Sequence, residues 1–466
     1  MRAVVVISLA AILLFAFLQH AAAKLDDARF EDLKKRISAN IRSDPASAKS
    51  DIGDIATDDS ARAVDFLVSL ASGVVSSPEL VDAVQSAFNA MNSEEAKGAI
   101  AQHSRTASDF RMRIILLESL ATRTGSIVIS ALIKAIDDSK EEVAYTAVRA
   151  LGEKRSESAI EPLVVLMEKL AKKKETGRLY NDCRIALEKI TGKKGLEEAQ
   201  DWRNWYEAYK AGIVPGGTPV EPSDATRPAG RGEVKTVSFF GLTIDSRRIV
   251  FIIDVSASML LADPPPDNWV PDKELGKKGG TRLREDEEAA LKKKREEELE
   301  KMKKDWEKER QRIYRVKKEL IKVIDALSPS VKFNIISFSD QISVWKNGLQ
   351  SATAANKTNA KDWVEKWQAE GYTWTDDALK EAFKDKEADT IVLLSDGAPT
   401  HLGGEGREEW GGHQDSKAII EAIYKWMGEN NKFRKITIHT LGFKEANFEF
   451  MKKLAEDNNG TFREIP

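Results

Sequence analysis

The 466-residue sequence has a single cysteine, Cys183, and only five histidines. One cysteine excludes an intrachain disulfide and a cysteine-rich metal cluster. Cys183 lies among apolar residues of a helical stretch, so we expect a buried structural thiol. The signatures His-Glu-x-x-His, Gly-x-Ser-x-Gly and Gly-x-x-x-x-Gly-Lys-Ser/Thr are also absent. Without these motifs of metal hydrolases, serine hydrolases and P-loop ATPases, we expect a non-catalytic protein.

The sequence also lacks an excess of charge of one sign. It has 72 Lys and Arg residues and 75 Asp and Glu residues, for a net charge of −3. Nucleic-acid binding requires a basic surface, so this balance argues against it.

Long apolar runs are missing after residue 18, and no later stretch could span a bilayer. The start of the chain combines Arg2, an apolar run over residues 3–18 and the small residues Ala21, Ala22 and Ala23. This pattern indicates a cleaved signal peptide over residues 1–23, and an uncleaved membrane anchor is the alternative. Cleavage would remove Arg2 and change the net charge from −3 to −4. We therefore expect an exported protein, and the lack of disulfides favours the bacterial periplasm or cell envelope, with an extracellular location as the alternative.

Residues 24–210 have the apolar spacing of helices throughout. Residues 117–121 resemble residues 148–152, and the same register returns at Ala186 and Leu187. A repeat of roughly 30–40 residues predicts a HEAT-like α-solenoid, whose helix pairs bury their faces against their neighbours and offer an extended binding surface. Trp202 and Trp205 would close its end. The alternative is an irregular helical bundle.

Residues 211–235 alternate proline with glycine, which is typical of a linker between domains. The remainder, residues 236–466, alternates strand and helix patterns and predicts an α/β doubly wound, Rossmann-like domain. We expect strands at residues 247–253, 332–337, 390–394, 435–441 and 461–465, and helices at residues 361–368, 376–383, 416–427 and 448–457.

An insertion over about residues 261–312 separates the first strand of this domain from its first helix. It begins with a Pro/Gly-rich loop and continues as a highly charged helical segment. Glu-to-Lys pairs at i,i+4 spacing support a solvated helix. If that helix ran without a break over residues 286–328, it would extend roughly 60 Å.

Oxygen-bearing side chains follow two of the expected strands. Asp254, Ser256 and Ser258 come after the first strand, and Asp396 follows the strand at residues 390–394; Thr373 lies in a loop between the two. Ligands of open parallel sheets bind beyond the carboxyl ends of the strands, so these segments would share one edge. Hydroxyl and carboxylate oxygens suit a hard cation, Mg²⁺, Mn²⁺ or Ca²⁺, better than zinc or copper.

The pattern Asp-x-Ser-x-Ser, then Thr, then Asp resembles the metal-ion-dependent adhesion site of von Willebrand factor type A (VWA) domains. The resemblance covers residues 236–466, with Ala257 where many members carry glycine. It implies that Ser256, Ser258 and Thr373 offer hydroxyls to the ion, while Asp254 and Asp396 hold it directly or through water. It also implies that an Asp or Glu of a protein partner replaces a water on the ion.

Several alternatives stay open from the sequence. Asp254 and Asp396 would, on the simplest view, only cap helices. His401 and His413 flank a Gly-rich loop and would form a second metal site or a general base near the first, or simply be residues of a surface loop. Trp410 in the same loop is a candidate for partner contact. The metal could be purely structural, in a scaffold or in an accessory subunit of a larger enzyme or ATPase complex. The sequence leaves the oligomeric state undetermined.

Overall fold

We describe a computed structural model of the chain, which covers residues 24–213, 237–263, 307–400, 416–444 and 446–466, together with residues 293, 294, 296, 297, 300, 301 and 304. The expected signal peptide, nearly all of the expected linker, most of the insertion, and His401, Trp410 and His413 lie outside the described residues. Contacts divide the chain into two units, residues 1–228 and 229–466.

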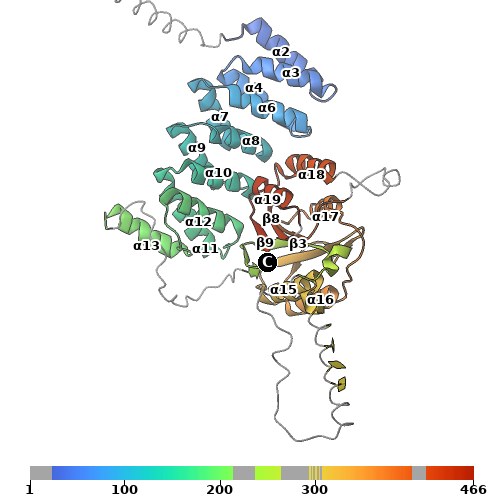
Figure 1. The fold of residues 1–466 in the computed structure, drawn as a ribbon. Helices are drawn as coiled ribbons and strands as arrows, with labels where there is room; N and C mark the ends of the chain where they lie inside the picture. The colour runs from blue at the N-terminus through green and yellow to red at the C-terminus, as the bar shows by residue number, and fades with distance from the viewer. Residues whose placement is uncertain are drawn as a thin grey trace, which may run out of the picture. The chain divides into compact units, whose positions relative to one another are not determined.

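The described part of the N-terminal unit is entirely helical, as predicted (Figure 1). Its elements are α2 (Asp27–Asn40), α3 (Pro45–Ala56), α4 (Ala61–Ser69), α5 (Ala71–Val74), α6 (Pro78–Ala90), α7 (Glu94–Thr106), α8 (Phe110–Ala121), α9 (Ser126–Ala135), α10 (Glu141–Lys154), the 3-10 helix η1 (Glu157–Ala159), α11 (Ile160–Lys172), α12 (Arg178–Thr191) and α13 (Ala199–Lys210).

Many helices of this unit contact a helix two or three positions further along the chain. Thus α6 contacts α8, α8 contacts α10 and α10 contacts α12, while α4 contacts α7 and α7 contacts α9. The helices therefore lie in two rows that continue along the unit (Figure 1). Several helices have a side chain that caps their first turn. At the start of α7, for example, the Ser93 hydroxyl accepts a hydrogen bond from the backbone N–H of Ala96 at 3.0 Å.

Two expected core positions of the helical unit are confirmed. Cys183 is fully buried in α12, and burial raises the pKa of its thiol. Trp202 on α13 is fully buried and donates from Nε1 to the carbonyl of Leu196 at 2.8 Å. Trp205 meets Trp202 edge to face, with 5.9 Å between the ring centroids. Helix α13 packs against α11 and covers this end of the helical core. No helix among the described residues is long and apolar enough to cross a membrane.

The C-terminal unit is built on a mostly parallel sheet, which confirms the predicted α/β class. Its strands are β1 (Val237–Phe239), β2 (Leu242–Ile244), β3 (Arg248–Asp254), β4 (Lys332–Phe338), β5 (Ile342–Val344), β6 (Gln350–Ser351), β7 (Thr390–Ser395), β8 (Thr437–Phe443) and β9 (Phe462–Ile465). The helices are the 3-10 helix η2 (Ala257–Leu260), α15 (Arg312–Ala326), α16 (Ala354–Glu365), α17 (Thr375–Ala382), α18 (Ser416–Asn431) and α19 (Phe448–Asp457).

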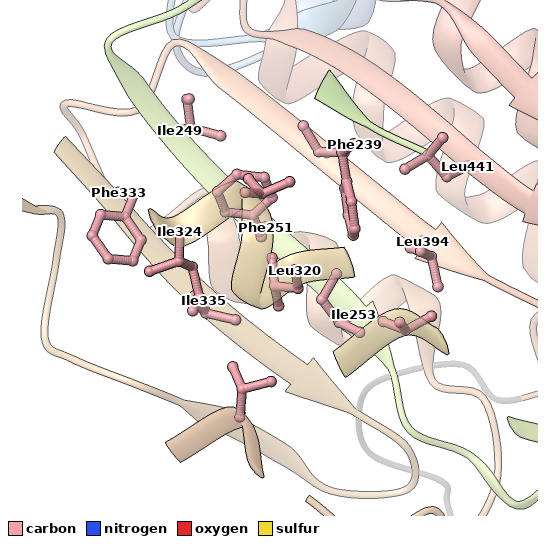
Figure 2. Close-up of a cluster of buried hydrophobic side chains, with 14 of the residues drawn as sticks. Phe239, Ile249, Phe251, Ile253, Leu320, Ile324, Phe333, Ile335, Leu394 and Leu441 are labelled. Atoms are coloured by element: carbon pink, nitrogen blue, oxygen red, sulfur yellow. The ribbon is translucent and has the colours of Figure 1, made fainter. Parts of the chain in front are cut away.

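The main sheet has the strand order β5-β4-β3-β7-β8-β9, with β5 and β6 antiparallel to β4 and the other pairings parallel. Both faces are covered, since alternate residues of β3 enter different cores. Ile249, Phe251 and Ile253 pack with α15 and the β1–β2 hairpin, as Figure 2 shows in part. Val250 and Ile252 pack with α17, α18 and α19. Burial on both faces explains why the parallel strands are nearly continuous apolar runs.

Several element boundaries differ from the sequence predictions. The charged helix does not run without a break into α15, because Gln311 has extended backbone and forms an antiparallel bridge with Ala262. Helix α16 begins at Ala354, earlier than predicted, where Thr353 caps it. Strand β8 begins at Thr437, two residues late, since Lys435 has a φ of +52°. The short strands β1, β2, β5 and β6 were not predicted.

Candidate metal centre

The candidate site lies where two central parallel strands end. Ile253 of β3 is in register with Leu394 of β7, so Asp254 and Ser395 end the strands side by side. The chain leaves β3 toward α15 on one face of the sheet and leaves β7 toward α18 on the other. Crevices at such switch points are where open α/β sheets bind ligands.

Asp254 is fully buried, and both of its carboxylate oxygens accept hydrogen bonds. Oδ1 accepts from the backbone N–H of Ser256 at 2.8 Å, and Oδ2 accepts from the hydroxyl of Ser395 at 2.6 Å. The two bonds fix the carboxylate at the strand end. The sequence prediction missed Ser395, although its place directly before Asp396 at the end of a strand was visible.

Hydroxyls connect the segment after β3 to the segment after β7. The Oγ atoms of Ser256 and Ser258 lie 3.0 Å apart, and Ser258 donates to Asp396 Oδ1 at 2.6 Å. Ser256 and Asp396 are almost fully buried, while Ser258 is partly exposed. Four of the five predicted site residues, including Asp254, therefore form one contiguous oxygen-lined group.

The loop that carries Thr373 is tied to the same place. The backbone N–H of Ala257 donates to the carbonyl of Gly371 at 3.1 Å. Thr373 is 5% exposed, and a Cβ built on Gly397 would lie 3.5 Å from its Oγ1. Thr373 thus packs beside the residue that follows Asp396, so all three sequence segments converge.

Gly371 permits this approach of the loop. Its φ is +77°, in the left-handed region that favours glycine, and a Cβ there would lie 2.1 Å from the Asp340 side chain. Tyr372, next to it, is 66% exposed.

A buried arginine that the sequence prediction missed also contacts the site. Nη1 of Arg312, the first residue of α15, donates to Asp396 Oδ2 at 2.8 Å, and both side chains are almost fully buried. Its Nε lies 3.3 Å from Asp263 Oδ1. Arg312 belongs to no sequence motif. It reaches Asp396 only because the two ends of the insertion pair with each other in the folded protein.

The electrostatics favour a cation at this place. Burial, and then the nearby charge of Asp396, raise the pKa of Asp254 to about 7. A carboxyl group with such a pKa resists ionisation unless positive charge is supplied. No group of three or more His, Cys, Asp and Glu side chains suited to a metal occurs among the described residues. The site instead combines two carboxylates with hydroxyls, a donor set that fits a hard divalent cation.

Helix capping explains little of this arrangement. Asp254 does accept one backbone N–H ahead of η2, but Asp396 accepts from the side chains of Ser258 and Arg312. Its carboxylate is therefore directed into the site.

Comparison with known proteins agrees with the fold. Residues 308–463 match the family model of the von Willebrand factor type A domain. Together with the sheet, this match shows that the helical region is followed by a VWA domain of α/β type. The matched stretch contains Thr373 and Asp396 but begins after Asp254, Ser256 and Ser258, since the insertion separates β3 from α15.

Relatives match about a third of the chain, and the chain spans less than a fifth of their own length. Human inter-alpha-trypsin inhibitor heavy chain H4 is 28% identical over 167 residues, which are 33% of this chain and 16% of that protein. Human von Willebrand factor A domain-containing protein 3B is 29% identical over 151 residues, 32% of this chain and 10% of that protein. A solved structure, a von Willebrand factor type A protein from Catenulispora acidiphila, is 17% identical, covers 48% of this chain and 40% of its own, and has a TM-score of 0.30.

Proposed function

We propose that the C-terminal unit binds Mg²⁺ or Mn²⁺, with Ca²⁺ as the other hard cation that fits, through Asp254, Ser256, Ser258, Thr373 and Asp396. The bound ion then captures an Asp or Glu side chain of a protein partner. The observation that carries this proposal is the 2.6 Å hydrogen bond from Ser258 to Asp396, which joins the segments after β3 and β7 into one oxygen-lined group.

The contacts of Asp254 suggest how the ligands divide their roles. Each of its carboxylate oxygens already accepts a hydrogen bond, from the Ser256 backbone and the Ser395 hydroxyl. Asp254 would therefore hold the ion through water, while Ser256, Ser258 and Thr373 would offer it their hydroxyls directly. Mg²⁺ retains waters and requires near-octahedral geometry, so one water position is available for exchange with a partner carboxylate.

For the whole chain we propose a non-catalytic binding or adhesion protein. The helical unit, with its two rows of helices, serves as a second interaction surface of the HEAT-like solenoid type. After removal of residues 1–23 the protein would act in the bacterial periplasm, in the cell envelope or outside the cell.

Calorimetric titration tests the metal site. Mg²⁺ and Mn²⁺ should bind the wild-type protein with one-to-one stoichiometry and should not bind Asp396→Asn. The matched control is Asp389→Asn, which alters a buried aspartate just before the other end of β7, hydrogen-bonded to Ser246 and paired with Arg248. This control should retain the ion. Equal metal binding by both variants would place the ion elsewhere.

Partner capture separates the bridging role from the scaffold alternative. A partner that binds through the ion is released by chelator and is lost on Ser258→Ala. A partner that remains bound in chelator points to the alternative, in which the metal is structural and the helical unit of a scaffold or accessory subunit does the binding.

A further inference from the structure

We propose that Arg312 is a positioning residue that sets the charge of the metal site, so that a bound divalent ion keeps surplus positive charge for an acidic ligand. This inference rests on the proposed metal site. Arg312 lies outside the five residues of the adhesion pattern, and its buried contact with Asp396 is the observation from which the inference starts.

The guanidinium of Arg312 is held from several sides. It donates to Asp396 Oδ2 at 2.8 Å, lies 3.3 Å from Asp263 Oδ1 and sits 5.4 Å from the ring centroid of Phe443. Its side chain is 4% exposed. A charge fixed in this way is screened little by solvent or salt, unlike that of a surface arginine.

The ends of the insertion place Arg312. The backbone N–H of Arg312 donates to the carbonyl of Leu261 at 3.0 Å, and the backbone N–H of Asp263 donates to the carbonyl of Arg310 at 3.2 Å. Together with the antiparallel bridge between Ala262 and Gln311, these hydrogen bonds pair two short segments at the ends of the insertion. We call the paired segments, Leu261–Asp263 and Arg310–Arg312, the neck. The neck fixes the start of α15, and so it fixes the position of the guanidinium.

Arg315 shows why the charge of Arg312 acts on Asp396. Arg315, one turn along α15, forms an ion pair with Asp263 and also lies near Phe443. It offsets the charge of Asp263, while Nη1 of Arg312 points to Asp396. No contact joins Arg315 to Asp396 among the described ion pairs and hydrogen bonds.

The charge balance then decides which ligand is favoured. With both carboxyl groups ionised, Asp254, Asp396 and Arg312 together carry a single net negative charge. A divalent ion turns this into a single net positive charge, which one carboxylate of a partner neutralises. Without Arg312 the loaded site would already be neutral, and the same carboxylate would leave it negative. Arg312 therefore weakens the hold on the ion and strengthens the hold on an acidic ligand.

Titration of Mn²⁺ into the full chain and two single variants tests this. Arg312→Gln should bind Mn²⁺ at least about tenfold more tightly than wild type, because a buried positive charge is removed. Arg315→Gln removes the same charge from the same helix without touching Asp396 and should stay within about threefold of wild type. Acetate added to the Mn²⁺-loaded proteins, followed by water-proton relaxation, should bind several-fold more weakly to Arg312→Gln.

The Mn²⁺ affinities of the three proteins distinguish failure of the proposed role of Arg312 from failure of the proposed metal site. An equal or weaker Mn²⁺ affinity of Arg312→Gln, or an equally large gain in Arg315→Gln, overturns the role of Arg312 and leaves the metal site standing. Absence of Mn²⁺ binding in all three proteins overturns the proposed function and this inference with it. If Arg312→Gln is unfolded without metal, refolding by Mn²⁺ supports the inference and failure to refold contradicts it.

Discussion

The hydroxyl of Ser395 donates a 2.6 Å hydrogen bond to Oδ2 of Asp254 across 141 positions of the chain. The bond connects the carboxyl ends of the two central strands. Because both groups are fully buried, this hydroxyl takes the place that water would otherwise hold on that oxygen.

Replacing Ser395 with alanine should therefore loosen the metal ligand beside it. Loss of a donor to a buried carboxylate costs about 1–3 kcal/mol, so we expect Mg²⁺ affinity to fall by roughly five- to a hundredfold, with a lower free energy of unfolding. Calorimetry with Mg²⁺ measures the first effect and urea unfolding the second. Ser104→Ala removes a buried hydroxyl from α7 of the helical unit and should leave Mg²⁺ affinity unchanged. Unchanged affinity in Ser395→Ala would argue that Asp254 needs no support from this side.

Gly371 offers a test of the loop that carries Thr373. Gly371→Ala places a methyl group against Asp340 and forces a positive φ on alanine, so we expect a loss of about 1–3 kcal/mol in unfolding free energy and a Mg²⁺ affinity at least severalfold weaker. Gly348→Ala is the matched control, since Gly348 has a φ of +83° but its Cβ would meet nothing nearer than 3.7 Å. Should both variants bind Mg²⁺ alike, the approach of the loop to Asp340 has no bearing on the ion.

The pKa of Asp254 predicts a pH dependence of metal binding. In the metal-free protein this pKa is raised to about 7, above the usual 3.8 of an aspartate, by burial and by Asp396. Between these values the folded state holds a proton that the unfolded chain has lost, so this group's contribution to stability falls as pH rises from about 4 to 7. The ion requires the carboxylate, so Mg²⁺ affinity should drop by up to about tenfold per pH unit below 7.

Calorimetry at pH 8, 7 and 6 in buffers of different ionisation enthalpy would report both the affinity and the released proton. Proton release at pH 6 that disappears at pH 8 is the expected result. A constant Mg²⁺ affinity across this range would contradict the raised pKa.

Trp202 predicts a separate effect on the helical unit. Trp202→Ala removes a fully buried side chain from α13 and should lower the unfolding free energy of that unit by about 3–5 kcal/mol. Trp205→Ala, at a partly exposed position of the same helix, should cost clearly less. Urea unfolding followed by circular dichroism measures the loss, and Mg²⁺ titration should show no change in either variant. A comparable loss in both would mean that the end of the helical core is closed in another way.

Much of the architecture followed from patterns in the sequence. Apolar runs at residues 390–394 and 332–337 mark β7 and β4, because parallel strands buried on both faces have few polar positions. The structure brings Asp254, Ser256, Ser258 and Asp396 into one group and packs Thr373 beside it. That an ion binds there stays a prediction, as do the repeat class of the helical unit, the domain boundaries and export.

What the sequence did not reveal depends on tertiary contacts. Ser395 and Arg312 belong to no motif, and only the ends of β7 and of the neck bring them to the carboxylates. The helix break at Gln311 arises from pairing with Ala262, against a local pattern that favours helix. Strands as short as β5 and β6 carry too few residues for an alternating pattern to be recognised.

The paired segments Leu261–Asp263 and Arg310–Arg312 have one more consequence. The two ends of the insertion lie next to each other, so the segment between residues 263 and 310 can be lengthened, shortened or replaced without disturbing the sheet. Joining residue 263 to residue 310 by a short turn should yield a trimmed protein with its Mg²⁺ affinity intact. The same junction is a place where a reporter or a foreign binding module can be grafted next to the ion.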